Sequence, residues 1–242
     1  MQQPLQGSPF SPIHSNIILD DLDKELERRG HCFVRFADDI SLYLSSETAA
    51  KRVMQSITLY IEETLKLKVN KEKTRITNPF DSTLLGFSFY QVKRKWKTRI
   101  SNKSISRVKS KCNEITGRSN GMSEESRIEK LMSLINGWVN YFKIAEGVKE
   151  KMLALDAHVR ARLRTCSWKQ WKHGKTRLRN LRQLGIKGPE AYYYAYSGKG
   201  YTHMARQRLV NMALSNSYYQ KKGYVGFYET YQRIIGRQTS LF

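Results

Sequence analysis

Two adjacent carboxylates, Asp38 and Asp39, are the residues of this sequence best suited to chemistry. They stand between two apolar, β-rich runs, residues 31–36 and 40–44, and this pattern predicts a hairpin with the acids at its tip. Adjacent carboxylates repel each other, whereas a divalent cation such as Mg²⁺ uses them as hard oxygen ligands. The alternative is structural, because Asp is common in β-turns, where its side chain bonds the local backbone.

The charge balance indicates a polyanionic partner. The 242 residues include 43 Lys or Arg against 21 Asp or Glu, a formal net charge of +22. This excess favours nucleic acid, with an anionic membrane surface as the competing partner. No apolar run approaches the ~20 residues that a membrane-spanning helix needs, and the N-terminus lacks a signal pattern. We expect no membrane association.

The cysteines carry no metal-binding pattern. Cys32, Cys112 and Cys166 are far apart in the sequence and show no paired spacing. They are therefore expected to be free thiols in a reducing compartment, which predicts a cytoplasmic protein.

The first hundred residues predict helices packed on an antiparallel sheet. A turn-rich loop leads into a helix with Ser11 as N-cap and Pro12 at its first position, and Gly30 ends this helix. Its predicted buried face carries Ile13, Ile17, Leu22 and Leu26. A second amphipathic helix is expected over residues 47–65, followed by short β-like segments at 67–69, 74–77, 84–92 and 96–100.

Beyond Ile100 the sequence predicts helices only. A basic helix is expected over 101–116, and Ser123 is expected to cap a second helix whose apolar residues keep helical period up to Phe142. A third helix is expected over 148–172, and shorter ones near 201–211 and 227–235. The fold class is therefore α+β, with predicted divisions into residues 1–100, 101–184 and 185–242.

Several motifs, in order along the chain, resemble the later palm motifs and the thumb of reverse transcriptases. The resemblance is strongest to the group II intron-encoded reverse transcriptase/maturase family and covers essentially the whole chain. It rests on Gln6-Gly7-Ser8-Pro9, Phe36-Ala37-Asp38-Asp39, Leu85-Gly86-Phe87, residues 135–142 (INGWVNYF) and residues 168–172 (WKQWK). It implies a partial palm over 1–100, a helical thumb or maturase domain X over 101–184, and a basic, Tyr- and Gly-rich C-terminal extension of the maturase domain over 185–242.

The resemblance implies nucleotidyl transfer with two Mg²⁺ ions. The catalytic residues would be Asp38 and Asp39, which would bind the metal ions, and Lys73, which would act at the pyrophosphate leaving group. Nucleotide-binding positions would be Gln6, Gly7, Phe36 and Ala37, with Phe36 in place of the family's usual Tyr; the primer grip would be Leu85, Gly86 and Phe87. For Lys73 the alternative stays open that it is one more solvated lysine.

The resemblance and the charge together predict an RNA-binding surface on the helical half. The expected contacts are Arg107, Lys109, Lys111, Arg160, Arg162, Arg164, Lys169, Trp171, Lys172, Lys175 and Arg177, with Arg179 beside them. Core packing is the expected role of Trp138, Tyr141 and Phe142. For Trp168 and Trp171, base stacking and core packing remain equal alternatives. His158 and His203 are assigned no site.

The family's palm also uses a third aspartate, on a strand upstream of the Gln-Gly loop, and the sequence begins at that loop. The resemblance therefore implies the C-terminal part of such an enzyme, either a truncated product or one piece of a split protein, and inactive alone. The predicted partners are structured intron RNA, an RNA/DNA primer-template and a separate N-terminal half. An unpaired sheet edge would also favour dimerisation.

Two functions follow as hypotheses. The first is RNA-directed DNA synthesis and intron maturation, in which this portion contributes the two aspartates. The alternative is a non-catalytic, maturase-like protein that binds intron RNA and assists its folding and splicing. A general basic RNA-binding protein unrelated to introns is a third possibility, which would make the likeness to domain X accidental.

Overall fold

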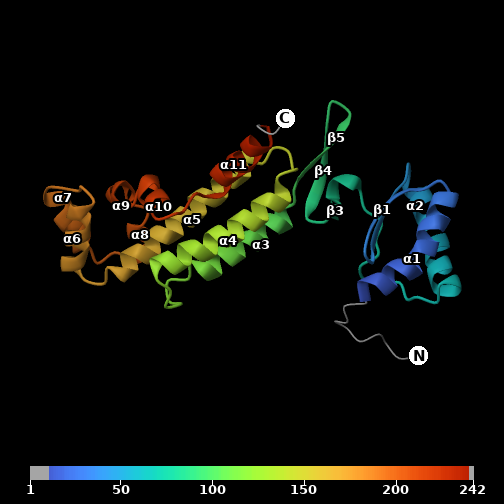
Figure 1. The fold of residues 1–242 in the computed structure, drawn as a ribbon, viewed down its shortest axis with the longest axis horizontal. Coiled ribbons are helices and arrows are strands. Elements are labelled where there is room, and N and C mark those ends of the chain that lie inside the picture. Colours follow the sequence, from blue (N-terminus) through green and yellow to red (C-terminus); the bar gives the residue numbers. More distant parts are fainter. Residues whose placement is uncertain (1–10, 240–242) are drawn as a thin grey trace. The chain divides into compact units, whose positions relative to one another are not determined.

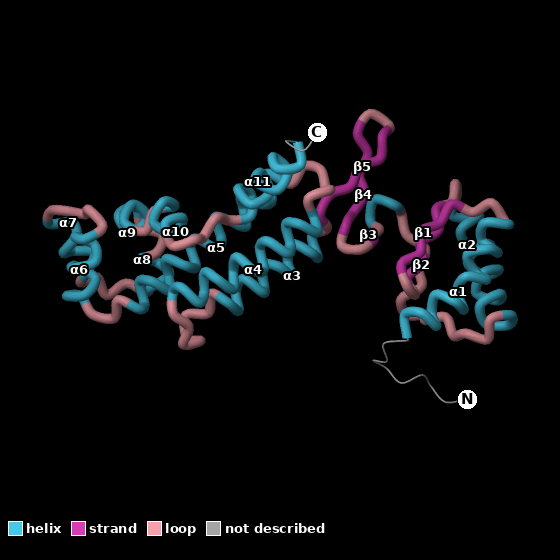
Figure 2. The backbone as a smooth tube through the Cα atoms, in the orientation of Figure 1, coloured by secondary structure: helices cyan, strands magenta, loops and turns pink. Residues whose placement is uncertain are grey.

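The computed structural model describes residues 11–239 and divides the chain into two compact units, one ending at Leu84 and one beginning at Leu85 (Figure 1). The first unit combines helices with a two-stranded hairpin, and the second joins a β-hairpin to a set of helices (Figure 2). The structure thus confirms the α+β class. The division at 84/85 falls earlier than the one expected near residue 100, and the three-part domain division stays a prediction.

The first unit is built on helix α1, which packs with the hairpin that follows it. Its elements in order are α1 (Ser11–Arg28), β1 (Cys32–Phe36), β2 (Asp39–Tyr43), α2 (Glu47–Leu59), the π-helical turn η1 (Tyr60–Thr64), the short 3₁₀ turn η2 (Pro79–Asp81) and β3 (Thr83–Leu84).

Local chemistry sets the ends of these helices. Gly30 adopts φ 70°, and its amide and that of His31 bond the carbonyls of Glu27 and Leu26 at 2.8 and 3.0 Å. This arrangement satisfies the last carbonyls of α1, as a C-terminal glycine commonly does, and confirms the predicted end of the helix. At the start of α2, the Ser46 hydroxyl accepts a hydrogen bond from the Ala49 amide at 3.2 Å.

The core of the first unit is small. Leu19, Leu22, Leu26 and Ile57 are buried, and hairpin residues such as Phe33 pack against them. Two predictions about this unit are wrong. Ile13 and Ile17 are exposed, because the first turns of α1 extend past this core, and residues 67–69 and 74–77 form no strand.

The second unit places a β-hairpin before its helices. Its elements are β4 (Phe87–Val92), β5 (Lys95–Ile100), α3 (Asn102–Ile115), α4 (Glu124–Phe142), α5 (Lys149–Gln170), α6 (Gly174–Gln183), α7 (Pro189–Ala195), α8 (Tyr201–Met204), α9 (Arg208–Ala213), α10 (Asn216–Lys221) and α11 (Phe227–Thr239). Helix α3 packs on α4 and α5, α11 lies along the same two helices, and α6 packs on α7 (Figure 1).

Serine caps and one continuous core hold this unit together. Ser101 caps α3 and Ser123 caps α4, each accepting a hydrogen bond from the amide three residues later; such caps contribute about 1 kcal/mol each. The apolar positions of α4 that keep helical period, among them Leu131, Ile135 and Val139, are fully buried. The core extends from Ile100 to Phe227 and includes the predicted C-terminal extension.

A buried carboxylate fixes the last helix. Asp156 of α5 accepts hydrogen bonds from the amides of Phe227 and Tyr228 at 2.6 and 3.1 Å, at the N-terminus of α11. Burial raises the pKa of the Asp156 carboxyl, although these two amides and the coulombic attraction of Arg160 oppose the rise. Gly226 leaves space for this contact, because a Cβ there would lie 2.7 Å from the carboxylate.

Within residues 11–239 no helix is long and apolar enough to cross a membrane.

Candidate active site and nucleic-acid interface

The Asp38-Asp39 pair lies at the tip of a tight hairpin, as the sequence predicts, with Asp38 in the turn and Asp39 at the start of β2. Strands β1 and β2 pair antiparallel with Phe36 opposite Asp39, so that Ala37 and Asp38 form the turn. Ala37 adopts φ 52°, a left-handed conformation that such two-residue turns require. Both carboxylates and the Phe36 ring are exposed. The hairpin therefore presents two carboxylates to solvent from a short loop of fixed register.

Arg35 ties this turn to helix α1. Its Nε and Nη2 donate to the Asp23 carboxylate at 2.5–2.9 Å, and its Nη1 donates to Asn16 Oδ1 at 3.0 Å and to the Ala37 carbonyl at 3.1 Å. The hydrogen bonds to Asp23 raise the pKa of Arg35, although partial burial opposes the rise. A single guanidinium thus joins the helix to the turn that carries Asp38.

The donor set at the turn fits part of a Mg²⁺ site. Asp38 and Asp39 offer the hard oxygen ligands that Mg²⁺ prefers, and this ion commonly takes one or two protein carboxylates together with substrate phosphates. Among the residues that the structure describes, no group of three His, Cys, Asp or Glu side chains is placed to hold an ion. Gln6 and Gly7, predicted to contact the nucleotide, lie outside the described residues.

Exposed apolar side chains belong to the two elements that Arg35 joins. Ile13, Ile17 and Ile18 of α1 and Val34 and Phe36 of β1 are all exposed. Exposed apolar side chains that lie together form surfaces that pack against another polypeptide segment.

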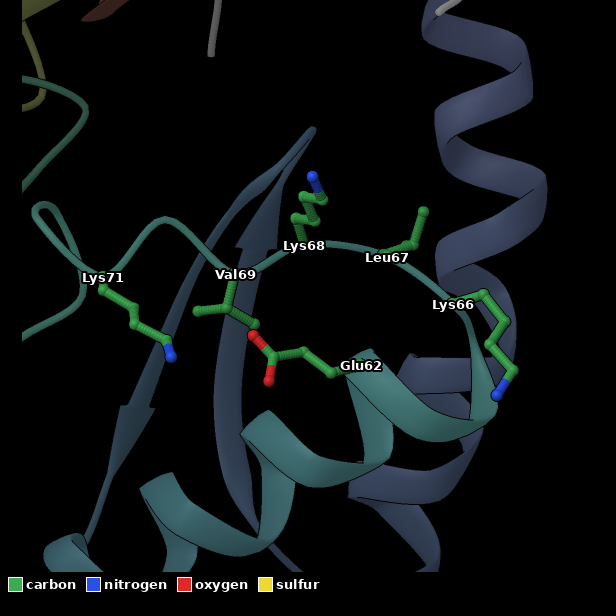
Figure 3. Close-up of a pocket in the computed structure, with 6 residues that line it drawn as sticks. All are labelled: Glu62, Lys66, Leu67, Lys68, Val69 and Lys71. Carbon is green, nitrogen blue, oxygen red and sulfur yellow. The ribbon is translucent and has the colours of Figure 1, made fainter. Parts of the chain in front are cut away.

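Lys73 lies in an exposed turn organised by Asn70, whose side-chain oxygen accepts hydrogen bonds from the amides of Glu72 and Lys73, each at 3.1 Å. The residues that precede this turn in the sequence line a shallow hollow of about 510 Å³: Glu62, Lys66, Leu67, Lys68, Val69 and Lys71. Figure 3 shows the Glu62 carboxylate turned toward Val69, while Lys66 and Lys68 extend outward. Lys73 itself does not line the hollow, and nothing in its contacts separates a catalytic role from that of a solvated lysine.

The Leu85-Gly86-Phe87 segment is clamped by helices α3 and α4. The Gly86 carbonyl accepts hydrogen bonds from the Ser101 amide and the Ser104 hydroxyl, both at 3.0 Å. The Tyr141 hydroxyl donates to the Leu85 carbonyl at 2.9 Å, and the Phe87 ring packs on Tyr141, 5.8 Å between centroids. Gly86 adopts φ 83°, and a Cβ there would lie 2.7 Å from the Ser104 hydroxyl. The segment is therefore fixed by packing, as a primer-holding element would need to be.

The predicted RNA-contact residues fall into two groups. Several point to solvent: Arg107, Lys109, Lys111, Lys172 and Lys175. The others direct their side-chain hydrogen-bond donors to groups of the chain itself or are partly buried. Arg162 bonds the Thr116 hydroxyl at 2.6 Å, Arg164 bonds the Leu214 carbonyl at 3.0 Å, and Arg160 is half-buried. Lys169 donates to the Ser119 hydroxyl at 3.0 Å.

The aromatic residues of the helical unit serve mostly as core. Phe142 is buried and Trp138 stands edge-on to Phe227 at 5.4 Å, whereas half of Tyr141 remains exposed despite its hydrogen bond. Trp168 is fully buried with the Arg177 guanidinium 5.2 Å above its ring. For Trp168 the structure favours core packing over base stacking.

Trp171 is half-buried and packs against Trp168. The two histidines that were assigned no site have ordinary polar partners. His158 bonds Asn113 and His203 bonds Gln207.

Sequence reasoning missed Arg35 and Asp156. A signal for Arg35 is present, because it occupies the same face of β1 as Phe33 and is a charged residue at an inward position of a strand with period two. Asp156 stands between two apolar helical positions, Leu155 and Val159, and a lone acid there indicates a buried hydrogen-bonded carboxylate.

The fold places an acidic hairpin on a helix and follows it with a basic helical unit. This is the order of the palm and thumb in a reverse transcriptase. Residues 5–116 match the reverse transcriptase (RNA-dependent DNA polymerase) family, and residues 105–185 match the group II intron, maturase-specific domain. The chain therefore contains a reverse transcriptase segment followed by a group II intron maturase-specific segment.

One curated relative is the Retron Mx65 reverse transcriptase of Myxococcus xanthus, 37% identical over 76 residues. The matched segment is 30% of this chain and 18% of the retron protein, so the chain spans less than a fifth of that relative's length.

Proposed function

We propose that this chain is the part of a group II intron reverse transcriptase/maturase that contributes the Asp38 and Asp39 carboxylates to the polymerase metal site and binds RNA through its helical unit. The observation that carries the proposal is the hairpin itself. Its tip presents the carboxylates of Asp38 and Asp39 to solvent, and Arg35 fixes the turn to α1.

The roles of the individual residues follow from their positions. When bound, Mg²⁺ would activate the primer hydroxyl and stabilise charge on the triphosphate. Asp38 and Asp39 would hold it through carboxylate oxygens, with Phe36 and Ala37, and Gln6 and Gly7 of the preceding loop, beside the incoming nucleotide. Lys73 would neutralise charge on the leaving group. The clamped segment Leu85, Gly86 and Phe87 would hold the primer end.

The exposed apolar surface of α1 and β1 supports a further step in the proposal. Ile13, Ile17, Val34 and Phe36 are exposed on the two elements that Arg35 joins, and another segment of a reverse transcriptase would bury this apolar area. We propose that such a segment covers the surface and supplies the remaining metal ligand. Self-association through the same surface is the competing outcome, and light scattering of the chain with and without that segment distinguishes the two.

The helical unit supplies the proposed grip on RNA. The exposed group Arg107, Lys109, Lys111, Lys172 and Lys175 would contact phosphates, which gives affinity that falls steeply with salt and depends little on sequence. Structured intron RNA and an RNA/DNA primer-template are the expected ligands. Arg162, Arg164 and Arg177 would position the helices that carry these contacts.

Primer extension tests the proposal. The chain is mixed with the upstream reverse transcriptase segment of a relative, an RNA template, a DNA primer, deoxynucleotides and Mg²⁺. Extension is expected only in the mixture and is expected to be lost in Asp38→Ala. The matched control is Asp81→Ala, which removes an exposed acid of the same unit far along the sequence from the hairpin. Extension that survives Asp38→Ala would contradict the proposal.

A second candidate function is RNA binding without catalysis, as in a protein that assists intron folding. This candidate is favoured because, among the described residues, no third carboxylate joins Asp38 and Asp39 to complete a metal site. No extension in any mixture, together with tight and salt-dependent binding of intron RNA, would select this candidate.

A further inference from the structure

Helix α7 and the residue that caps its C-terminus expose three aromatic rings that neither the core nor the proposed active site uses. Tyr192, Tyr193 and Tyr196 are 53%, 73% and 48% exposed. The rings of Tyr192 and Tyr196, one helical turn apart, lie 4.5 Å between centroids at 33°, and Tyr193 stands edge-on to Tyr192 at 6.4 Å. We refer to these three residues as the α7 tyrosine surface.

The α7 tyrosine surface is held in place by packing beneath it. Ala191 and Ala195 are fully buried and seat the helix on the core, so the tyrosine rings are not needed for that contact. Tyr196 lies against Gly174, the first residue of α6, where an added Cβ would be 2.6 Å from its ring. The rings therefore form a fixed surface on an anchored helix.

The surroundings of this surface are strongly basic. Residues 172–199 carry seven Lys or Arg and a single acid, Glu190. Helix α6 packs on α7, and its own side chains Lys175, Arg179 and Arg182 are exposed, as is Lys187 in the connection between the two helices. Such a surface complements a polyanion and would repel a basic protein.

We infer that the α7 tyrosine surface stacks with unpaired bases of single-stranded RNA, while the basic residues of α6 contact the adjoining phosphates. Aromatic rings stack with any base because every base has a π-face, and unpaired bases are free to do so whereas paired bases are already stacked within the helix. The inference rests on the proposed RNA-binding function and adds to it a ligand class: a single-stranded segment, bound with little sequence preference.

Binding measurements with ring-removing and ring-keeping variants test the stacking. Fluorescence anisotropy compares the full chain with Tyr192→Leu/Tyr193→Leu and with Tyr192→Phe/Tyr193→Phe, using a labelled 12-nucleotide single-stranded RNA and its duplex. The Leu pair should weaken single-strand binding about tenfold or more and duplex binding less than twofold. The Phe pair should bind as the unchanged chain does.

Met212→Ala, at an exposed apolar residue of α9, is the control for a general surface effect. Equal losses in the Leu and Phe pairs would show hydrogen bonding by the hydroxyls and overturn the stacking. If the Leu pair lost affinity equally for single-stranded and duplex RNA, or lost none for either, single-stranded RNA would be ruled out as the ligand class.

Photocrosslinking locates the bound bases. Single-stranded RNA carrying 5-iodouridine should crosslink to the tryptic peptide 188–199, which contains the whole α7 tyrosine surface, because the excited base reacts with an aromatic ring stacked on it. RNA binding with crosslinks only elsewhere would refute the inference and leave the proposed RNA-binding function intact. Absence of binding to any RNA would refute both, and capture of an acidic protein by the same surface would replace RNA as its partner.

Discussion

The link between Arg35 and Asp23 is expected to hold the metal-site turn in its observed conformation. Arg35→Met keeps the aliphatic stem and removes every guanidinium bond, including the one to the Ala37 carbonyl at 3.1 Å. Asp23 then loses the partner that meets it at 2.5–2.9 Å. The hairpin of β1 and β2 should therefore open more often.

The size of this effect follows from the geometry. Hydrogen bonds to charged groups contribute about 1.5–3 kcal/mol. The Arg35 and Asp23 side chains remain 14% and 24% exposed, and solvent screening places the coupling between them in the lower half of that range, at about 2 kcal/mol. A difference of about 2 kcal/mol corresponds to a roughly 30-fold change in an opening equilibrium.

Hydrogen exchange read by mass spectrometry measures this opening in peptides that cover residues 32–43. Arg35→Met, Asp23→Asn and the double variant form a cycle that isolates the coupling. The control is Lys24→Met, because Lys24 and Asp20 pair on the same helix at 69% and 56% exposure, and an exposed pair of this kind contributes 0–1 kcal/mol. If the coupling free energy between Arg35 and Asp23 is no larger than the change in opening free energy caused by Lys24→Met, the positioning role of Arg35 is refuted.

Three further predictions concern stability and reactivity. Gly86→Ala should destabilise the second unit by about 1–3 kcal/mol in urea unfolding, because strain at φ 83° adds to the close contact of the new Cβ with the Ser104 hydroxyl. Gly185→Ala, at φ 89° with open space around it, should destabilise the unit less. Equal losses of stability in the two variants would contradict the effect of the close contact. Burial raises the pKa of Asp156 above its ordinary 3.8, so the folded chain holds the carboxyl proton more tightly than the unfolded chain does. The free energy of unfolding should therefore fall relative to that of Asp156→Asn as pH rises from about 4. A difference in unfolding free energy between the two proteins that does not vary with pH would refute this. Cys32 is exposed, whereas burial raises the pKa of Cys112 to about 11, so a thiol reagent at neutral pH should modify one of the three thiols rapidly; rapid modification of all three would contradict the buried placement.

Local sequence chemistry predicted the elements whose ends depend on a single residue. Gly30 ends α1 and Ser123 caps α4 as expected, because both effects act within one helical turn. The turn at Asp38 was predictable for the same reason: the runs on either side of it are apolar and rich in β-forming residues, and the register leaves two residues to close the hairpin.

Burial was less predictable, because it requires a partner layer that periodicity does not reveal. Ile13 and Ile17 keep the helical spacing of a buried face but extend past the core that covers Leu22 and Leu26. Residues 67–69 have the composition of a strand but join neither of the two sheets that the structure describes.

The candidate site shows the same limit. Composition identifies the helical unit as basic but does not distinguish Arg162, which bonds Thr116 across two helices, from exposed Lys111. Arg35 depends on Asp23, twelve residues earlier on another element. Such pairings are tertiary and follow only from the folded chain.

The most direct test of the account is a metal-specificity switch at Asp38 in the primer-extension mixture. Asp38→Cys replaces a hard carboxylate with a thiolate, which binds Mg²⁺ poorly and Zn²⁺ or Cd²⁺ well. The account predicts that extension is lost with Mg²⁺ alone and partly restored by added Cd²⁺ in Asp38→Cys, and that Cd²⁺ restores nothing in Asp38→Ala. Full activity of Asp38→Cys with Mg²⁺ alone, or the same response to Cd²⁺ in both variants, would contradict the role of Asp38 as a metal ligand.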